Sequence, residues 1–282
     1  MGYIELCTHQ NQATDTSTDL KPPFSLADIS TQKYNKLARK HVLIFGGTSG
    51  LGYAVAEASI ESNACVTISS SSSWRIQNTI TSLKETYPSA EVTGYPCDLS
   101  KATLEADLET LFQQVGKVDR IIFTAGESLK VIPLNEATLE SIMKAGQVRF
   151  FAPLLVAKVG SKYLEKSTAS SIVLTTGSVA QKPIPGWSIL SSYKAGLQGM
   201  TRGLAIDLKP IRVNVVSPGP VDSELWDFMG EGEKAFLDGM AENFPTGHVG
   251  RPEELAEAYL WLMKDSNVTG FVAYSDSGLK LV

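Results

Sequence analysis

Apolar runs alternate with helix-like patterns from residue 41 to the end of the chain. The first run, HVLIFGG (41–47), is almost wholly apolar and ends in glycines, which is typical of a strand buried on both faces of a sheet. Six further strand-like runs follow, at 64–69, 91–98, 118–126, 170–178, 211–219 and 270–278. Because parallel strands need crossover helices, this alternation predicts an α/β fold: one doubly wound parallel sheet of about seven strands with helices on both faces.

The longest helical patterns cover 136–165, 189–207 and 253–263. Residues 1–37 differ from the rest, because they are polar, have no sustained period and contain the pair Pro22-Pro23. We therefore predict a flexible or partly helical N-terminal extension over 1–37 and a single folded domain over 38–282.

Composition and charge narrow the classes of partner. The net charge is −5 and no basic run exceeds two residues, so we expect neither a nucleic-acid nor a membrane partner, but a small-molecule substrate. The three cysteines and three histidines are scattered, which argues against disulfides and a metal site. With no targeting signal and no long apolar stretch, the sequence predicts a cytoplasmic protein.

A glycine-rich segment, FGGTSGLG (45–52), follows the first strand and opens a helix. Glycines let the backbone approach a ligand, while the N–H groups and dipole at a helix N-terminus attract a pyrophosphate. This context predicts a Rossmann-type dinucleotide site. The residues expected to form it here are Gly46, Thr48, Ser49, Gly50, Leu51 and Gly52.

The end of the second strand indicates which dinucleotide would bind. An acidic residue there would hold a ribose 2′-hydroxyl, but this chain has Ser69–Ser73 followed by Arg75. Hydroxyls and a guanidinium suit a phosphate, so we expect NADP(H) to be bound by Ser70, Ser71 and Arg75. The alternative is a solvated serine-rich loop with a surface arginine.

Five segments, in order, resemble the short-chain dehydrogenase/reductase family over about residues 40–282. They are GGTSGLG (46–52), CDLS (97–100), TAG (124–126), TTGSVA (175–180) and VNVVSPGPVDSEL (213–225). The resemblance implies a homo-oligomer, a substrate lid over about 223–250, and NADP(H) contacts beyond the glycine loop. These further contacts would come from Asp98, Leu99, Thr124, Ala125, Gly126, Lys194, Pro218, Gly219 and Val221.

The resemblance also implies a catalytic tetrad of Asn, Ser, Tyr and Lys, and this chain retains only half of it. Ser178 and Lys194 match, whereas Leu190 replaces the tyrosine and Gln147 replaces the asparagine. The family's tyrosine lies four residues before the lysine, which places both on one helix face. Tyr193 is adjacent to Lys194, and adjacent helical residues diverge by about 100°, so we interpret Tyr193 as a packing or interface residue, with a displaced acid role as the alternative.

Two more residues are candidates for the active site. Arg149 lies in the apolar run VRFFAPLLV (148–156), where an arginine is costly to bury without a partner. It is either structurally paired or in contact with substrate or nicotinamide. Trp187 lies in a Pro/Gly-rich loop and is either a wall that stacks an extended substrate or a packing residue. We count Ser178, Lys194, Arg149 and Trp187 as the catalytic candidates.

These features predict an NADP(H)-dependent oxidoreductase of atypical mechanism that acts on an apolar, natural-product-like iminium or carbonyl compound. An iminium would need no acid, because hydride transfer leaves a neutral amine. The chain also resembles the bifunctional reductase/Diels–Alderases of fungal malbrancheamide and paraherquamide biosynthesis, although Ile184 stands where that group has an acidic residue. The alternatives are a carbonyl reductase or alcohol dehydrogenase with a relocated proton donor, and a cofactor-bound cyclase or non-redox NADP(H)-binding module.

Overall fold

The fold is a seven-stranded sheet in which every pair of neighbouring strands is parallel, as predicted. The computed structural model describes residues 33–127 and 131–282, and the strand order is β3-β2-β1-β4-β5-β6-β7. The strands are β1 (His41–Phe45), β2 (Cys65–Ser70), β3 (Val92–Pro96), β4 (Arg120–Phe123), β5 (Ser171–Thr175), β6 (Arg212–Pro218) and β7 (Val272–Ser275). The order reverses between β1 and β4, the position at which ligands bind in doubly wound sheets.

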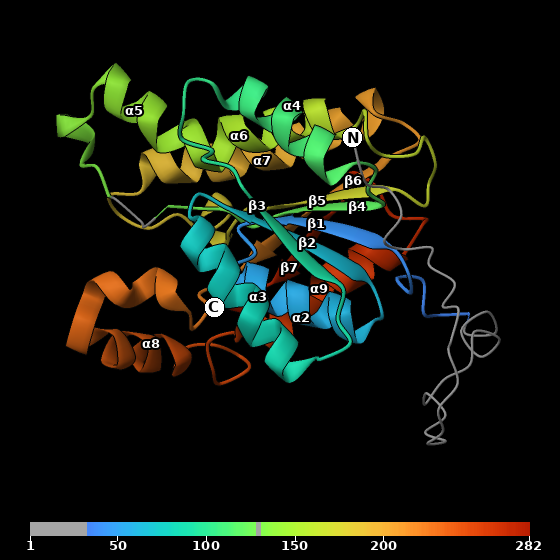
Figure 1. The fold of residues 1–282 in the computed structure, drawn as a ribbon. Coiled ribbons are helices and arrows are strands. Elements are labelled where there is room, and N and C mark those ends of the chain that lie inside the picture. Colours follow the sequence, from blue (N-terminus) through green and yellow to red (C-terminus); the bar gives the residue numbers. More distant parts are fainter. Residues whose placement is uncertain (1–32, 128–130) are drawn as a thin grey trace, which may run out of the picture.

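Helices cover both faces of the sheet (Figure 1). One layer contains α4 (Leu104–Val115), α5 (Leu139–Gly146), α6 (Ala152–Gly160) and α7 (Ser188–Asp207). The other contains α2 (Gly50–Glu61), α3 (Ser73–Thr86) and α9 (Pro252–Lys264). A separate pair of elements, the 3-10 segment η4 (Glu224–Gly232) and α8 (Glu233–Ala241), lies to one side of these layers.

The alternation of side chains along the strands divides the core into two parts. In β1, Leu43 and Phe45 pack with the layer of α4, α6 and α7, whereas Val42 and Ile44 pack with the layer of α2, α3 and α9. All four side chains are buried, because successive residues of a strand point to opposite faces and both faces are covered. Leu37, at the end of the predicted extension, is also fully buried in the second part; residues 1–32 lie outside the described residues.

The helical pattern predicted over 136–165 is confirmed for 139–160, but it is not one regular α-helix. The segment forms α5, a π-helical turn η2 (Gln147–Phe151) and α6. A π turn accommodates one extra residue per turn, and such turns are frequent at functional sites. Here the turn contains both Gln147 and Arg149, so it determines the directions in which these two side chains leave the helix.

Two arginines fasten α9 to the edge of the sheet at which the strands begin. Arg120, at the start of β4, donates from Nε to the carbonyl of Met263 at 3.0 Å. Arg212, at the start of β6, donates to the carbonyls of Leu262 at 2.7 Å and Met263 at 3.0 Å. The last carbonyls of a helix lack partners within it, and cations are favourable there. Burial lowers the pKa of Arg120 to about 10, with a smaller effect from the charge of Arg212.

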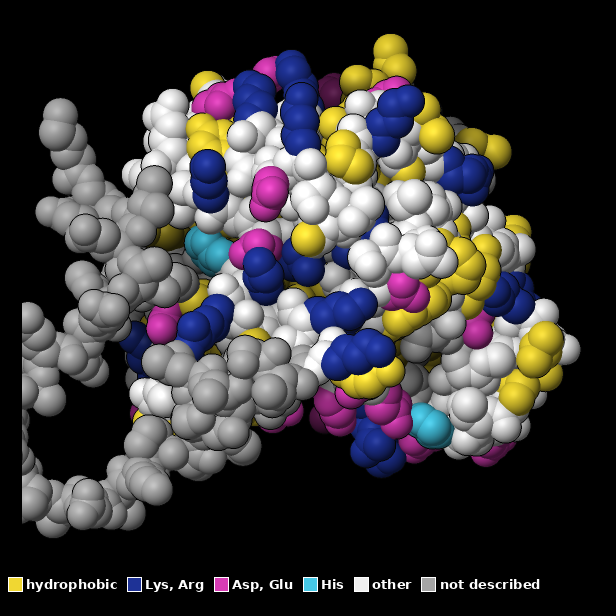
Figure 2. All heavy atoms as spheres, turned by 90° about the vertical axis from the view of Figure 1, so that its right-hand side faces the viewer, with side chains coloured by type: hydrophobic (Ala, Val, Ile, Leu, Met, Phe, Trp, Pro, Cys, Tyr) yellow, Lys and Arg dark blue, Asp and Glu magenta, His cyan; other side chains and the backbone are white. Residues whose placement is uncertain are grey.

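The face that lies at the right of Figure 1 carries charges of both signs. Figure 2 shows lysine and arginine side chains interspersed with aspartate and glutamate there, without a continuous basic block. Within the described part of the chain, none of the helices has the length and hydropathy that a bilayer span requires.

Candidate functional site

A cavity of about 700 Å³ lies at the carboxyl ends of the strands, where the strand order reverses. All residues predicted to bind the cofactor line this one cavity. They are Gly46, Thr48, Ser49, Gly50, Leu51, Gly52, Ser70, Ser71, Arg75, Asp98, Leu99, Thr124, Ala125, Gly126, Lys194, Pro218, Gly219 and Val221. The segments that contribute them are far apart in sequence, and the parallel sheet brings them together because it places its strand ends along one edge.

The glycine-rich loop passes very close to the end of β4. Gly46 has φ +85°, and a Cβ on it would lie 2.6 Å from the Cα of Ala125; one on Gly52 would lie 2.0 Å from the carbonyl oxygen of Gly46. Only glycine fits these two positions. At the start of α2, the N-cap residue Ser49 makes no side-chain cap, and the first turn has no acidic residue. This N-terminus can therefore receive an anionic ligand from the cavity.

The end of β2 provides hydroxyls and a guanidinium. The Oγ of Ser69 is buried in the cavity wall without a hydrogen-bond partner among the described residues. Ser70, Ser71 and Arg75 line the same wall, and Arg75 is exposed in the first turn of α3. Its guanidinium forms no ion pair with any residue in the described ranges. These groups fit the 2′-phosphate of an NADP(H) molecule.

Asp98 and Leu99 form the next part of the wall, after β3. The Oδ1 of Asp98 accepts hydrogen bonds from the Oγ of Ser100 at 2.6 Å and from its backbone N–H at 3.0 Å. These bonds lower the pKa of Asp98, the side-chain bond having the larger effect. Gln147, at the family's asparagine position, donates from Nε2 to the carbonyl of Leu99 at 3.4 Å. Gln147 thus connects the π turn to this wall.

Lys194 projects from α7 to the end of β5. Its Nζ donates to the carbonyl of Thr176 at 3.0 Å, and the Oγ1 of Thr176 donates to the carbonyl of Lys194 at 2.5 Å. Burial and, to a smaller extent, the positive charge of Arg149 together lower the pKa of Lys194 to about 7. Lys194 therefore changes charge near neutral pH.

Arg149 lies on the other side of the same cavity, against the end of β4. Its guanidinium covers Gly126, where an added Cβ would lie 2.9 Å from a terminal nitrogen, and it donates to the main-chain carbonyl of Glu127. Burial lowers its pKa, whereas the charge of Glu127 acts in the opposite direction. Arg149 forms no ion pair with the described acidic residues. Arg149 thus has a main-chain hydrogen-bond partner and lines the cavity, and its contact with substrate or nicotinamide stays a prediction.

Tyr193, the neighbour of Lys194, contacts α5. Its hydroxyl donates to the carbonyl of Ile142 in α5 at 2.9 Å, and its ring packs against Phe150 with centroids 5.1 Å apart. A Cβ on Gly146 would lie 2.5 Å from this ring, and burial raises the pKa of the phenol. These contacts give Tyr193 a packing role between α5 and α7. Leu190, one turn before Lys194, is half-buried.

The other two catalytic candidates do not line the cavity. Ser178 is buried and begins the 3-10 turn η3 (Ser178–Ala180) just after β5, close in sequence to Thr175 and Thr176, which do line it. Trp187 is half-buried and is the residue before α7, where its carbonyl accepts from the backbone N–H of Ser191 at 2.8 Å. Their predicted roles stay predictions.

Sequence reasoning missed several residues of the wall. Thr176 forms hydrogen bonds with both the ammonium group and the main-chain carbonyl of Lys194. Its position one residue beyond a buried strand could have identified Thr176 as a residue of the wall. Val148 and Glu127 flank Arg149 on the cavity surface. No periodicity indicates that these two would meet, because the contact depends on the π turn.

The predicted lid segment reaches the cavity through Trp226. This side chain is buried, lines the cavity and donates from Nε1 to the carbonyl of Val221 at 2.8 Å. Its ring packs against Phe236 of α8, with centroids 5.5 Å apart. Gly230 has φ +56°, so the backbone bends sharply within η4.

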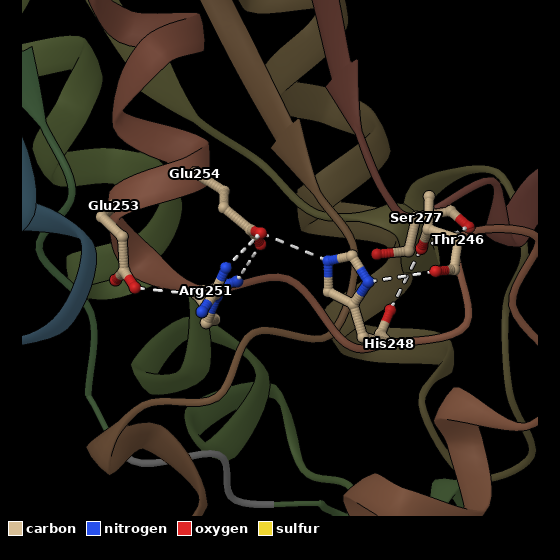
Figure 3. Close-up of polar contacts among 6 residues, drawn as sticks. All are labelled: Thr246, His248, Arg251, Glu253, Glu254 and Ser277. Atoms are coloured by element: carbon tan, nitrogen blue, oxygen red, sulfur yellow. Dashed lines mark hydrogen bonds and ion pairs between the residues drawn. The ribbon is translucent and has the colours of Figure 1, made fainter.

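The end of the predicted lid segment is anchored to the start of α9 (Figure 3). His248 Nε2 lies 3.3 Å from Glu254 Oε1, and the same oxygen pairs with Arg251 at 3.0 Å. Thr246 contacts the carbonyls of His248 and Ser277, at 3.2 and 3.5 Å. Hydrogen bonds from Arg251 lower the pKa of Glu254, so this carboxylate stays charged.

The fold and cavity define a Rossmann-class nucleotide-binding α/β protein. Within that class, the chain belongs to the short-chain dehydrogenase/reductase family, because the family model described as an SDR-like Rossmann domain matches residues 33–282. Short-chain dehydrogenase/reductase fsr5 of Gibberella fujikuroi is 45% identical, with 89% of this chain and 99% of that protein covered. Short-chain dehydrogenase/reductase malC of Malbranchea aurantiaca is 42% identical, covering 89% and 98%.

Two solved structures extend the comparison. The MalC reductase/Diels–Alderase of Malbranchea aurantiaca superimposes with a TM-score of 0.84 and 41% identity, covering 88% of this chain and 99% of that one. An NADPH-bound short-chain oxidoreductase from Pseudomonas aeruginosa, with an atypical catalytic center, has a TM-score of 0.77 and 26% identity, covering 85% and 96%. Close relatives of this chain are thus fungal members of the family.

Proposed function

We propose that this protein is an NADP(H)-dependent reductase of an apolar small molecule and that it works without the family's tyrosine. One observation carries the proposal: the cavity that is suited to a dinucleotide also contains Lys194 and Arg149, while position 190 has no proton donor. Both cations are half-buried and hydrogen-bonded to main-chain carbonyls.

The preference for NADP(H) rests on the wall after β2. Arg75 and the neighbouring serines present donors and one positive charge, and no acidic residue stands where one would repel a 2′-phosphate. The NADPH complex of the Pseudomonas relative supports the same cofactor. Replacing Arg75 with Gln should weaken NADPH binding about ten- to hundredfold and leave NADH binding nearly unchanged, as measured by cofactor fluorescence. Equal loss for both cofactors would contradict this assignment.

When bound, NADPH would supply the hydride. For a carbonyl substrate, the carbon accepts the hydride and the oxygen accepts a proton, which gives an alcohol. Arg149 and Lys194 are placed to stabilise the negative charge that develops on this oxygen, and fixed charges in a site with little water are effective at this task. Lys194 can also give the proton, because a donor with a pKa near 7 is well matched to neutral pH. Ser178 remains our proposed group for orienting the substrate, and Trp187 a proposed wall.

The two cations favour a carbonyl over an iminium. An iminium carries a positive charge into the cavity end that contains Arg149 and Lys194, and like charges repel there more strongly than in water. The similarity to the MalC reductase/Diels–Alderase supports a second candidate, in which the cofactor-bound cavity also guides a cyclisation.

The test is NADPH consumption against matched cyclic ketones and cyclic imines. We expect ketone turnover to exceed imine turnover. Turnover of imines alone would favour the iminium alternative, and tight NADPH binding without any oxidation would contradict a reductase. Product analysis with a tethered diene and dienophile tests the cyclisation candidate.

A further inference from the structure

Arg149 and Lys194 form what we call the cationic end of the cavity. Both line it, and Arg149 is near enough for its charge to affect the titration of Lys194. We propose that this end binds the negatively charged oxygen of an ionised enol or phenol, so that the substrate binds as an anion, while the hydride goes to a separate ketone carbonyl of the same molecule, because the carbon of an ionised enol or phenol accepts no hydride. The inference rests on the proposed function and adds the substrate class.

The first argument is that each cation has a hydrogen-bond partner but, among the described residues, no ion-pair partner. The guanidinium of Arg149 donates to the main-chain carbonyl of Glu127, and the ammonium of Lys194 donates to that of Thr176. Neither forms an ion pair within the described part of the chain. A charge taken out of water without a counter-ion is unfavourable, and an anion that enters the site removes this cost.

The second argument is that the other charges of the wall are placed elsewhere. Asp98 is held by Ser100 after β3. Glu224 lies beside the glycine loop, where its carboxylate would be 3.3 Å from a Cβ on Gly50. Glu127 is the carboxylate whose charge raises the pKa of Arg149, and it is exposed, with no ion pair to that guanidinium. Arg75 lies at the wall after β2, with the serines.

The third argument is that the same cavity also has apolar surface. Val148, Val221 and Trp226 are buried side chains that line the same cavity. A flat, conjugated ring system that carries an ionised hydroxyl combines an apolar body with an anionic edge. Such a molecule complements both parts of this surface, whereas an iminium complements only the apolar part.

The experiment uses the full chain saturated with NADPH and a matched set of probes. 4-Hydroxycoumarin is an acidic enol that is anionic at neutral pH, and 4-methoxycoumarin has the same ring without the charge. N-methylquinolinium is a cation of similar size. Isothermal titration calorimetry should show that the anion binds at least about tenfold more tightly than the methyl ether, and more tightly than the cation, because charge-assisted hydrogen bonds are the strong ones.

Variants show which residue provides the preference. Arg149→Gln should reduce the preference for the anion to about threefold or less, and Arg149→Lys should retain most of it. Arg202→Gln is the matched control, because Arg202 is an exposed residue of α7 outside the cavity wall. Each variant is first shown to be saturated with NADPH by cofactor fluorescence.

Proton uptake provides a readout that a merely structural role would not change. An anion next to Lys194 stabilises its ammonium form, so binding of 4-hydroxycoumarin at pH 8 should take up a proton, measured by calorimetry in buffers of different ionisation enthalpy. The methyl ether should take up none. Lys194→Arg should abolish the uptake but keep the preference for the anion.

Three results would overturn the inference: binding of the anion and its ether within threefold, tighter binding of the cation, or no measurable binding of the anion up to millimolar concentration. Equal weakening of both coumarins in Arg149→Gln would also overturn it. The proposed function is judged separately, by NADPH oxidation. If the anion binds but no NADPH is oxidised, the anion site is supported and the proposed reductase function is contradicted. If NADPH is oxidised but the anion is not preferred, the reductase function is supported and the anion site is contradicted.

Discussion

At the scale of single residues, position 190 distinguishes this site from the family pattern that its sequence resembles. Lys194 is present and fixed at both ends by Thr176, whereas Leu190 precedes it by one helical turn. The neighbouring Tyr193 does not compensate, because its hydroxyl is bonded to the carbonyl of Ile142. The proposed reduction would therefore take its proton from another group, and Lys194, whose pKa is lowered to about 7, lines the cavity.

Leu190→Tyr should restore an acid beside Lys194. We expect it to raise the reduction of simple ketones by about tenfold or more, since positioned acids contribute about 10²–10⁴-fold in enzymes. The measurement is kcat/KM with NADPH and a cyclic ketone. Leu190→Phe is the control, because it has the same ring without the hydroxyl. An equal gain in both variants would mean that pocket shape, not proton donation, limits the parent.

The protonation of Lys194 should appear in the pH dependence of the parent enzyme. Its pKa is lowered to about 7, so the ammonium form exists below this pH and is lost above it. If Lys194 gives the proton, kcat/KM for a ketone should fall as the pH rises through about 7. Lys194→Arg keeps its charge and should remove this inflection. A profile that is flat from pH 6 to 9 in the parent would exclude Lys194 as the donor.

At the scale of elements, the π turn between α5 and α6 organises the site. The π turn directs Gln147 to the carbonyl of Leu99 and Arg149 to Gly126, and Tyr193 holds the preceding helix α5 against α7. Periodicity could not predict this π turn, because the apolar pattern continues through it. By contrast, the glycine loop was predictable, since its chemistry depends on a strand, a turn and a helix that are consecutive in sequence.

Tyr193→Phe separates a packing role from a catalytic one. Loss of one hydrogen bond between α7 and α5 should lower the free energy of unfolding by about 1 kcal/mol. The parent activity should stay within about threefold, because the ring still packs on Phe150. Urea denaturation and kcat/KM measure the two effects. A loss of activity of a hundredfold or more with unchanged stability would make Tyr193 the relocated acid.

At the scale of the whole molecule, the edge of the sheet at which the strands end and the edge at which they begin have different roles. The carboxyl edge forms the cavity, and the apolar runs predicted its position because they predicted the parallel strands. The amino edge holds α9 through Arg120 and Arg212. The sequence did not reveal these bonds, since an arginine at the start of a strand has no local pattern and its partners lie tens of residues away.

Arg212→Met should therefore destabilise the whole domain. It leaves the buried carbonyls of Leu262 and Met263 without this donor, and one unsatisfied buried group costs about 1–3 kcal/mol. We expect a loss of about 3 kcal/mol or more in the free energy of unfolding, measured with guanidinium chloride. Arg202→Gln, on the exposed side of α7, should change it by less than about 0.5 kcal/mol. Similar values for the two variants would contradict this assignment.

The hydrogen bonds from Arg120 and Arg212 to α9 also have a consequence for how such a protein can evolve. Stability that is secured at one edge leaves the opposite edge free to accept substitutions that would otherwise threaten folding. A lineage can then lose a catalytic tyrosine, gain an arginine and acquire new substrates while it keeps an intact framework. The same separation makes this chain a suitable starting point for engineering, because its cavity can be redesigned without first repairing its fold.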